Sequence, residues 1–232
     1  MIEVLYTHFH SMLGEDRWKS LLQQVPPECQ GEILRFRRWQ DRHARLFSRL
    51  ILMEGLKKYG CGPETLREIS STAYGRPFLR GPVDFNISHS EEYVVCAVSD
   101  RGRVGIDIEQ IRPVALEDFK RVLRPEEWRE IERSERLDER FFTYWTIKES
   151  VIKAHGQGLS TPLQDVYMDQ DQAILYDTRW FVHHLKIAEG YLCHLAVERE
   201  GSEISISPVL FSERGLTGSR APIPTKKKGF TV

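Results

Sequence analysis

The apolar positions of this chain follow two periods, one typical of helices and one typical of strands. Apolar residues three and four positions apart predict helices over residues 41–58, 116–123, 125–133 and 138–154. Alternating or short continuous apolar runs between turn residues predict strands near residues 83–87, 93–98, 104–109, 165–168, 173–176, 180–186, 191–197 and 204–206. The order of helix, strands, helix and strands predicts two halves of similar plan that meet near Arg103.

Domain organisation follows from the same pattern. We expect an N-terminal half over residues 1–103 and a C-terminal half over residues 104–211. Residues 212–232 have few periodic apolar positions and contain two prolines and the lysine run 226–228. We therefore expect a mobile tail there, and a solvated tail is a commoner role for such a run than a binding arm.

Composition excludes several classes of protein. The chain has 232 residues, of which 41% are apolar, enough for a sizeable core. Its 33 Lys and Arg residues balance 34 Asp and Glu residues, so no global field favours a nucleic acid or an anionic membrane as a partner. The four cysteines form no C-x-x-C pair, and no apolar run approaches the ~20 residues of a membrane span. We expect a cytoplasmic protein without a disulfide framework or zinc site.

The strand over residues 104–109 carries a candidate metal site. Strict alternation puts Asp107 and Glu109 on one face and Ile106 and Ile108 on the other. The two carboxylates are then roughly 7 Å apart, close enough to share a divalent cation. The polar face of an ordinary surface strand is the alternative explanation.

The second long helix adds a carboxylate and two lysines. Glu149 lies at the border of the apolar arc, and Lys153 follows four residues later on the same flank. A helical ion pair would explain these two residues, but it would not explain Lys148, which falls inside the apolar arc. That ammonium group needs either a route to solvent or an anionic partner, which a bound phosphate would supply.

Two turns add further polar groups. In residues 86–90 (N-I-S-H-S), Ser88 and His89 can donate hydrogen bonds to an anion, although local turn chemistry also explains such residues. The turn over residues 75–77 carries Arg76, and by itself it is most simply a turn. Together with the carboxylates, these groups suggest Mg²⁺ and a phosphorylated substrate.

In this order, the segments resemble those of the surfactin-type 4′-phosphopantetheinyl transferases, in the holo-[acyl-carrier-protein] synthase superfamily. The matching segments are N-I-S-H-S at 86–90, G-I-D-I-E at 105–109, W-x-x-K-E-S-x-x-K at 145–153 and G-x-G-L-S at 156–160. Residues 74–77 are similar to the family's Y-G-K-P turn, with Arg replacing Lys. The resemblance covers about residues 35–197. It implies an α+β fold made of two α/β halves related by a pseudo-two-fold axis. Each half would be a long helix packed on a small antiparallel sheet. It further implies a monomer that binds its coenzyme at the seam between the halves.

The resemblance also implies roles for particular residues. Asp107, Glu109 and Glu149 match ligands that hold Mg²⁺ against the pyrophosphate of coenzyme A. The residues that match coenzyme-binding positions are Gly75, Arg76, Asn86, Ser88, His89, Lys148 and Lys153. Both lysines match positions near the coenzyme's phosphates, whereas Arg76, Ser88 and His89 match residues around the adenosine 3′-phosphate.

The implied reaction is attack by a serine hydroxyl of an apo acyl or peptidyl carrier protein on the β-phosphate of coenzyme A, releasing adenosine 3′,5′-bisphosphate. Lysines such as Lys153 would stabilise the leaving phosphate. Glu149, directly or through a metal-bound water, is the first candidate for the base, and Glu127 is the second. A module that binds coenzyme A or a carrier without catalysis, and an unrelated Mg²⁺-dependent phosphohydrolase, are the alternatives.

The chain departs from the family pattern just before the first long helix. Cys29 and Glu32 stand where basic residues are expected. Part of the phosphate contact would then fall to neighbouring arginines, for which the candidates are Arg35, Arg37, Arg38 and Arg45.

Overall fold

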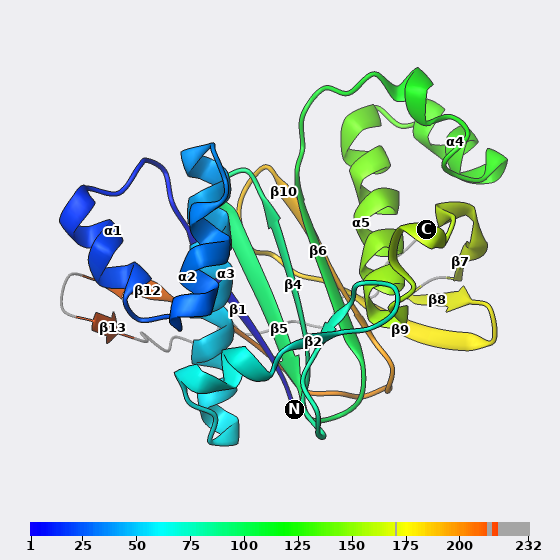
Figure 1. The fold of residues 1–232 in the computed structure, drawn as a ribbon. Coiled ribbons are helices and arrows are strands. Elements are labelled where there is room, and N and C mark those ends of the chain that lie inside the picture. Colours follow the sequence, from blue (N-terminus) through cyan, green and yellow to red (C-terminus); the bar gives the residue numbers. More distant parts are fainter. Residues whose placement is uncertain (170, 213–214, 218–232) are drawn as a thin grey trace.

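The computed structural model describes residues 1–169, 171–212 and 215–217 (Figure 1). Its α-helices are α1 (Glu15–Leu22), α2 (Pro27–Leu34), α3 (Trp39–Leu56), α4 (Pro125–Glu132) and α5 (Leu137–His155). Its strands are β1 (Ile2–His8), β2 (Ser70–Ser71), β3 (Pro77–Phe78), β4 (Asp84–Ser90), β5 (Tyr93–Ser99), β6 (Val104–Gln110), β7 (Val166–Asp169), β8 (Gln172–Leu175), β9 (Thr178–His184), β10 (Tyr191–Val197), β11 (Ile204–Pro208), β12 (Leu210–Ser212) and β13 (Gly215–Thr217). Short 3₁₀ helices cover Lys57–Tyr59, Pro63–Glu68, Leu116–Phe119, Gly158–Ser160 and Leu163–Asp165.

Two larger sheets form the centre of the molecule. The first has the strand order β11-β1-β5-β4, in which only the β1–β11 pair is parallel. The second has the order β6-β10-β9-β8-β7 and is antiparallel throughout. Figure 1 shows helices α1 to α3 on the side of the first sheet and helices α4 and α5 on the side of the second.

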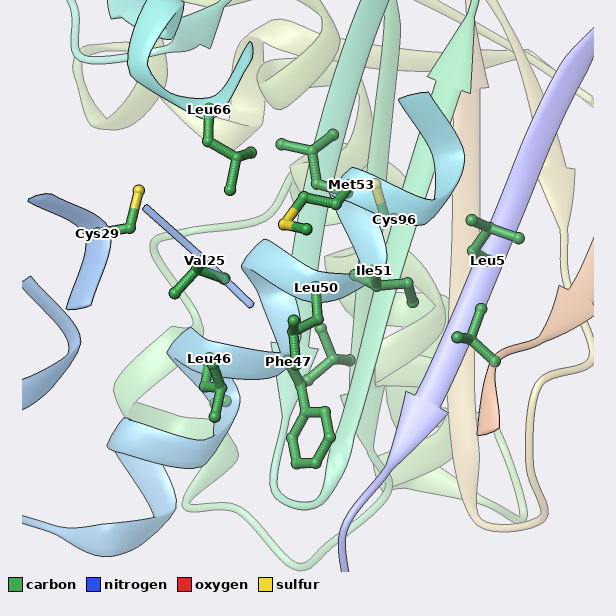
Figure 2. Packing of buried hydrophobic residues seen from close by; sticks show 14 of the residues in the cluster. Leu5, Val25, Cys29, Leu46, Phe47, Leu50, Ile51, Met53, Leu66 and Cys96 are labelled. Carbon is green, nitrogen blue, oxygen red and sulfur yellow. The ribbon is translucent and has the colours of Figure 1, made fainter. Parts of the chain in front are cut away.

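Helix α3 covers the outer face of the first sheet. Phe47, Leu50 and Ile51 are almost completely buried and belong to one apolar cluster with Leu5 of β1 and Cys96 of β5 (Figure 2). In the same way, α5 packs against the outer face of the second sheet. Each half therefore buries one long amphipathic helix on one sheet.

The inner faces of the two sheets share a second apolar cluster. Val4 and Val95 from the first sheet pack in it with Val104, Ile106 and Leu195 from the second. Strand β5 contributes to both clusters, because its successive side chains point to opposite faces and both faces are buried. The two halves therefore have a continuous core.

Strands β4 and β6 meet at the seam without pairing through their backbones. Four backbone N–H groups of β6 donate instead to side-chain oxygens of β4 at N···O distances of 2.9 to 3.4 Å: Val104 to Asp84, Ile106 to Asn86, Ile108 to Ser88 and Gln110 to Ser90. The donors and the acceptors both recur every second residue. The side chains on one face of β4 therefore accept hydrogen bonds from the backbone N–H groups along one edge of β6. We call this set of four bonds the seam ladder.

The α+β fold class, with a long helix on a sheet in each half, is confirmed. Both long helices lie within a few residues of their predicted bounds, and a strand forms at each predicted position. The helix predicted over residues 116–123 is wrong, because only the 3₁₀ helix Leu116–Phe119 forms and the chain turns before α4. No side chain of Leu116–Phe119 is buried, so packing does not offset the cost of nucleating a longer helix there.

Several elements near the two ends of the chain are not anticipated by the sequence. Strand β1 and helices α1 and α2 were not predicted. The chain after residue 200 returns to the first sheet, where β11 pairs with β1. Of the expected tail over residues 212–232, the structure describes Ser212 and β13, and the rest lies outside the described residues. No helix of the described part of the chain is long and apolar enough to cross a membrane.

Candidate functional site

Strand β6 presents its acidic side chains to helix α5. Gly105, Asp107 and Glu109 lie on the face opposite the isoleucines of the inner core. Gly105 is the point of closest approach, because a Cβ on this residue would overlap the backbone carbonyl oxygen of Ser150. The next two residues of this face, Asp107 and Glu109, are close enough to Glu149 of α5 to influence its charge.

Burial and the negative charge of Asp107 raise the pKa of both neighbouring glutamates. Burial raises the pKa of Glu149, and the negative charge of Asp107 raises it further. Burial also raises the pKa of Glu109, again with a contribution from Asp107. Lys153 lowers the pKa of both glutamates but does not cancel these effects. The group therefore carries an excess of negative charge that a cation would relieve.

The donor chemistry of this group fits a hard divalent cation. Asp107 is only 4% exposed, and its Oδ2 atom is buried with no hydrogen-bond partner among the described residues. Carboxylate oxygens are the ligands that Mg²⁺ prefers. In the part of the chain that the structure describes, no three His, Cys, Asp or Glu side chains form a compact metal-binding group. The positive charge beside Asp107 comes from Lys153, whose Nζ atom lies 2.6 Å from Asp107 Oδ1.

Serines from β4 complete this network. Ser88 Oγ donates to Asp107 Oδ1 at 2.9 Å and accepts a hydrogen bond from Lys153 Nζ at 3.0 Å. Ser90 Oγ donates to Glu109 Oε2 at 2.8 Å. Because β4 belongs to the first sheet and both acidic residues belong to the second, the site draws on both halves of the molecule.

A cavity of about 700 Å³ opens beside Lys153, between the two halves. Its first-half wall comes from α2, α3, the segment over residues 66–77 and β4, and its second-half wall from the end of α5 and the turn after it. The basic side chains of the wall are Arg45, Arg49, Arg67, Arg76, His89 and Lys153. Gly75 and Asn86 also line it, so the cavity gathers most of the residues expected to bind a phosphorylated ligand.

His89 lies between the two serines in sequence but on the other face of β4. Its imidazole is exposed and lines the cavity. Desolvation by the surrounding walls lowers its pKa, and the positive charge of Lys153 lowers it further. A bound phosphate would act in the opposite direction and favour the imidazolium form.

The arginines before and within α3 are distributed differently from the expectation. Arg45 lines the cavity, whereas Arg35, Arg37 and Arg38 are not among its wall residues. Sequence reasoning missed Arg49 and Arg67. Arg49 could have been found, because it follows Arg45 by four residues and so lies on the same face of the helix.

Arg76 is saturated with protein partners in this structure. Its guanidinium makes two bonds with the carboxylate of Asp84, at 2.9 and 2.7 Å. It also donates to the carbonyl oxygens of Lys153 and Val104 at 2.9 and 3.1 Å, and more weakly to that of Pro77. Arg76 thus links the turn over residues 75–77 to α5 and β6, and its role toward a phosphate stays a prediction.

Lys148 also finds its partner within the protein. Its side chain is fully buried, and Nζ lies 2.7 Å from Glu127 Oε1 of α4. Nζ also donates to the carbonyl oxygens of Leu163 and Val166 at 3.0 and 2.9 Å. The second carboxylate oxygen of Glu127 accepts a hydrogen bond from the backbone N–H of Arg124. Of the two possibilities for Lys148, a route to solvent or an anionic partner, this structure has the second, and the anion is Glu127.

Comparison with known families covers nearly the whole described chain. A family model described as the 4′-phosphopantetheinyl transferase superfamily matches residues 103–200. A second model, described as the N-terminal part of 4′-phosphopantetheinyl transferase, matches residues 14–101. The boundary between the two matches falls just before β6, where the structure has its seam.

Individual relatives agree with the family models. The chain is 30% identical over 201 residues to the 4′-phosphopantetheinyl transferase gsp of Aneurinibacillus migulanus. This match covers 83% of this chain and 84% of the relative. It is 32% identical over 167 residues to the 4′-phosphopantetheinyl transferase Sfp of Bacillus subtilis strain 168, covering 68% and 73% of the two chains. A shorter match, 41% identical over 91 residues, covers 37% of this chain and 38% of the 4′-phosphopantetheinyl transferase HetI of a Nostoc species.

Proposed function

Because this chain belongs to the 4′-phosphopantetheinyl transferases, we propose that it transfers phosphopantetheine from coenzyme A to a serine of an apo carrier protein. Adenosine 3′,5′-bisphosphate is the second product, and the reaction depends on Mg²⁺. The observation that carries the proposal is the adjacency of an acidic group and a basic cavity at the seam. Lys153 belongs to both, since it pairs with Asp107 and also lines the cavity.

Each part of the site has a defined task in this proposal. Asp107, Glu109 and Glu149 would hold the metal, which when bound would neutralise charge on the phosphate under attack. The basic cavity would bind the phosphates of coenzyme A and orient them. Lys153 would stabilise the negative charge that develops on the leaving bisphosphate.

Glu149 is the better candidate for the base. Before a metal binds, burial and the charge of Asp107 raise the pKa of this carboxyl group, and a raised pKa suits a general base that acts near physiological pH. In the transfer step, the serine oxygen forms a bond to the β-phosphorus, the bond from that phosphorus to the adenosine bisphosphate breaks, and the serine proton passes to Glu149. Glu127 is 5% exposed and both its oxygens have partners, so we assign it to the support of Lys148.

We also propose that the enzyme acts as a monomer, with the two halves of one chain supplying the composite site. The seam draws residues from β4 and β6, which supports this arrangement. Light scattering would test it, and a dimer that alone is active would contradict it.

The transfer reaction can be tested directly. The protein is incubated with coenzyme A, Mg²⁺ and each of several apo acyl and peptidyl carriers, and the carriers are analysed by mass spectrometry. We expect at least one carrier to gain the mass of one phosphopantetheine group. The Glu149→Gln variant should lose at least about 100-fold in rate, because general-base catalysis alone contributes that much. As a control, Glu15→Gln makes the same change of charge on the exposed helix α1 and should keep its activity.

Different failures point to different functions. No mass gain with any carrier would overturn the proposal. Binding of coenzyme A without transfer, equal in the natural protein and in Glu149→Gln, would support a binding module. Release of inorganic phosphate from nucleotides without a carrier would support a phosphohydrolase.

A further inference from the structure

Helix α2 contributes acidic residues to the wall of the basic cavity. Glu28 and Glu32 line it together with the arginines. Glu28 Oε2 accepts a hydrogen bond from Arg67 Nε at 3.1 Å. Glu32 Oε2 lies 3.0 Å from a guanidinium nitrogen of Arg49 and 3.4 Å from one of Arg45. In this structure, the three cavity arginines other than Arg76 are therefore paired with carboxylates from one short helix.

The Glu32 cluster has more positive charge than its carboxylate can balance. Arg45 and Arg49 are one helical turn apart and share a single oxygen of Glu32. Their Nε atoms are both buried and have no hydrogen-bond partner among the described residues. The cluster therefore retains one net positive charge and spare donors, which are the properties of an anion-binding site.

The Glu32 carboxylate is a replaceable partner. Its side chain is 47% exposed, and an exposed ion pair stabilises a protein only slightly. A phosphate dianion carries more charge and more acceptor oxygens than a carboxylate, and it would compete with Glu32 for the same guanidinium groups. Glu32 itself would then face the incoming phosphate and repel it.

We infer that Glu32 is a specificity-determining residue that competes with a phosphate group of the substrate for Arg45 and Arg49. This inference rests on the proposed function in taking coenzyme A as the ligand of the cavity. Glu32 weakens the binding of phosphorylated ligands and leaves the chemical step unaltered, because it has no contact with Asp107, Glu149 or Lys153. Its removal should lower KM without a change in kcat.

Calorimetric binding of adenosine 3′,5′-bisphosphate to the full chain tests the competition without any transfer. Glu32→Gln removes the charge but keeps the shape, and we expect it to bind the bisphosphate about five-fold more tightly, since two partly exposed ion pairs no longer compete. Glu15→Gln is the matched control, because its carboxylate pairs with Lys19 outside the cavity, and its affinity should not change. The gain in affinity of Glu32→Gln should also become smaller as salt is added, because salt screens the repulsion between Glu32 and the phosphate.

A double-mutant cycle identifies the groups that Glu32 blocks. Arg49→Met should weaken binding, and Glu32→Gln should add less affinity to this variant than to the natural protein, because only Arg45 remains for Glu32 to block. Arg45→Gln provides a second, more exposed background if Arg49→Met fails to fold.

Three outcomes would overturn the inference: equal or weaker binding by Glu32→Gln, a gain in affinity that is undiminished in both arginine backgrounds, or no measurable binding to either protein. A gain in bisphosphate affinity without loading of any carrier would refute the proposed function alone. Carrier loading with an unchanged KM in Glu32→Gln would refute the role of Glu32 alone.

Discussion

His43 is a buried imidazole whose two nitrogen atoms have different tasks. It is 3% exposed, and Nδ1 lies 2.8 Å from the carbonyl oxygen of Trp39, which can only accept a hydrogen bond. Nε2 lies 3.0 Å from the backbone N–H of Leu13, which can only donate one. The ring must therefore be neutral, with its proton on Nδ1. Protonation of Nε2 would break the bond to Leu13.

This arrangement predicts a loss of stability in mild acid. Burial lowers the pKa of His43 in the folded protein, whereas the unfolded chain takes up the proton near pH 6.5. As pH falls below about 6.5, the unfolded state binds a proton that the folded state does not, so the free energy of unfolding decreases by up to ~1.4 kcal/mol per pH unit. Urea unfolding between about pH 7.5 and about pH 5.5 measures this slope, the pH limits being about one unit on either side of the unfolded pKa.

Substitution separates His43 from the other histidines. The pH dependence should be flatter in His43→Gln than in the natural protein, whatever the stability of the variant at pH 7. Equal slopes in the natural protein and in His43→Gln would contradict the prediction.

At the scale of single residues, the sequence identified charged side chains that need partners, but it did not identify the partners. Lys148 falls in an apolar arc and needed either a route to solvent or an anion. Nothing in the sequence distinguishes a phosphate from Glu127, which lies 21 residues earlier, as that anion. Ser88 and Asp107 were both candidates, but their hydrogen bond depends on how two sheets meet. The tertiary structure decides which residue becomes the partner, and the local pattern of the sequence does not contain that information.

At the scale of elements, the Glu127–Lys148 pair fixes helix α4 on helix α5. The pair lies in a buried setting, with Trp128 and Ile131 of α4 packed in the same apolar cluster as Phe141 of α5. Removal of one partner leaves an uncompensated charge or unsatisfied polar group, so we expect Lys148→Met to lower the free energy of unfolding by about 3–5 kcal/mol. Glu127→Gln should cost less, because the amide can still accept a hydrogen bond.

The double variant Lys148→Met with Glu127→Leu tests whether the cost comes from the broken pair. Chemical denaturation should show that it is more stable than Lys148→Met alone, because two apolar groups of similar size replace the ion pair. A double variant that is no more stable than Lys148→Met alone would contradict a coupled pair. If Glu127 were the base instead, Glu127→Gln would lose activity without losing stability.

Elements with a strong internal pattern were predictable, and elements defined by distant partners were not. Helices α3 and α5 have long apolar stripes. Helix α5 ends at Gly156, and the 3₁₀ turn that follows α3 ends at Gly60. Strand β1 lies between β5 and β11, so it exists through pairing with residues about 90 and 200 positions away. Helices α1 and α2 each bury only one or two side chains, which leaves a weak period in the sequence.

At the scale of the whole molecule, the shared inner core joins the halves into one cooperative unit. Val4, Val95, Ile106 and Leu195 come from four strands and two sheets, and all are fully buried. We therefore expect a single unfolding transition, with calorimetric and van't Hoff enthalpies that agree. Ile106→Ala should lower the stability of the whole chain by about 2–5 kcal/mol.

Calorimetry and circular dichroism can distinguish this behaviour from that of two independent domains. Ile106→Ala should shift one transition without splitting it. The exposed Leu137→Ala serves as a control and should change the stability by less than about 0.5 kcal/mol. Two resolved transitions in the natural protein would contradict the prediction.

The sequence anticipated two halves and a site at their junction but not the nature of the junction. Periodicity identified β4 and β6 separately, and the resemblance to a family placed a coenzyme at the seam. The seam ladder could not be foreseen, because it depends on a register between strands of different sheets in which Asp84, Asn86, Ser88 and Ser90 all face the same neighbour.

The seam ladder has a consequence for the behaviour of the protein in a crowded solution. A strand at the margin of a sheet normally offers a free row of N–H and C=O groups to any extended chain, and proteins must block this route to aggregation. On β6, the N–H groups that face β4 are already occupied by side chains. The short polar side chains of β4 thus occupy the hydrogen-bond donors at the edge of β6. Replacing them by alanine would leave an edge strand with unpaired backbone N–H groups, prone to pair with other chains, in an otherwise folded protein.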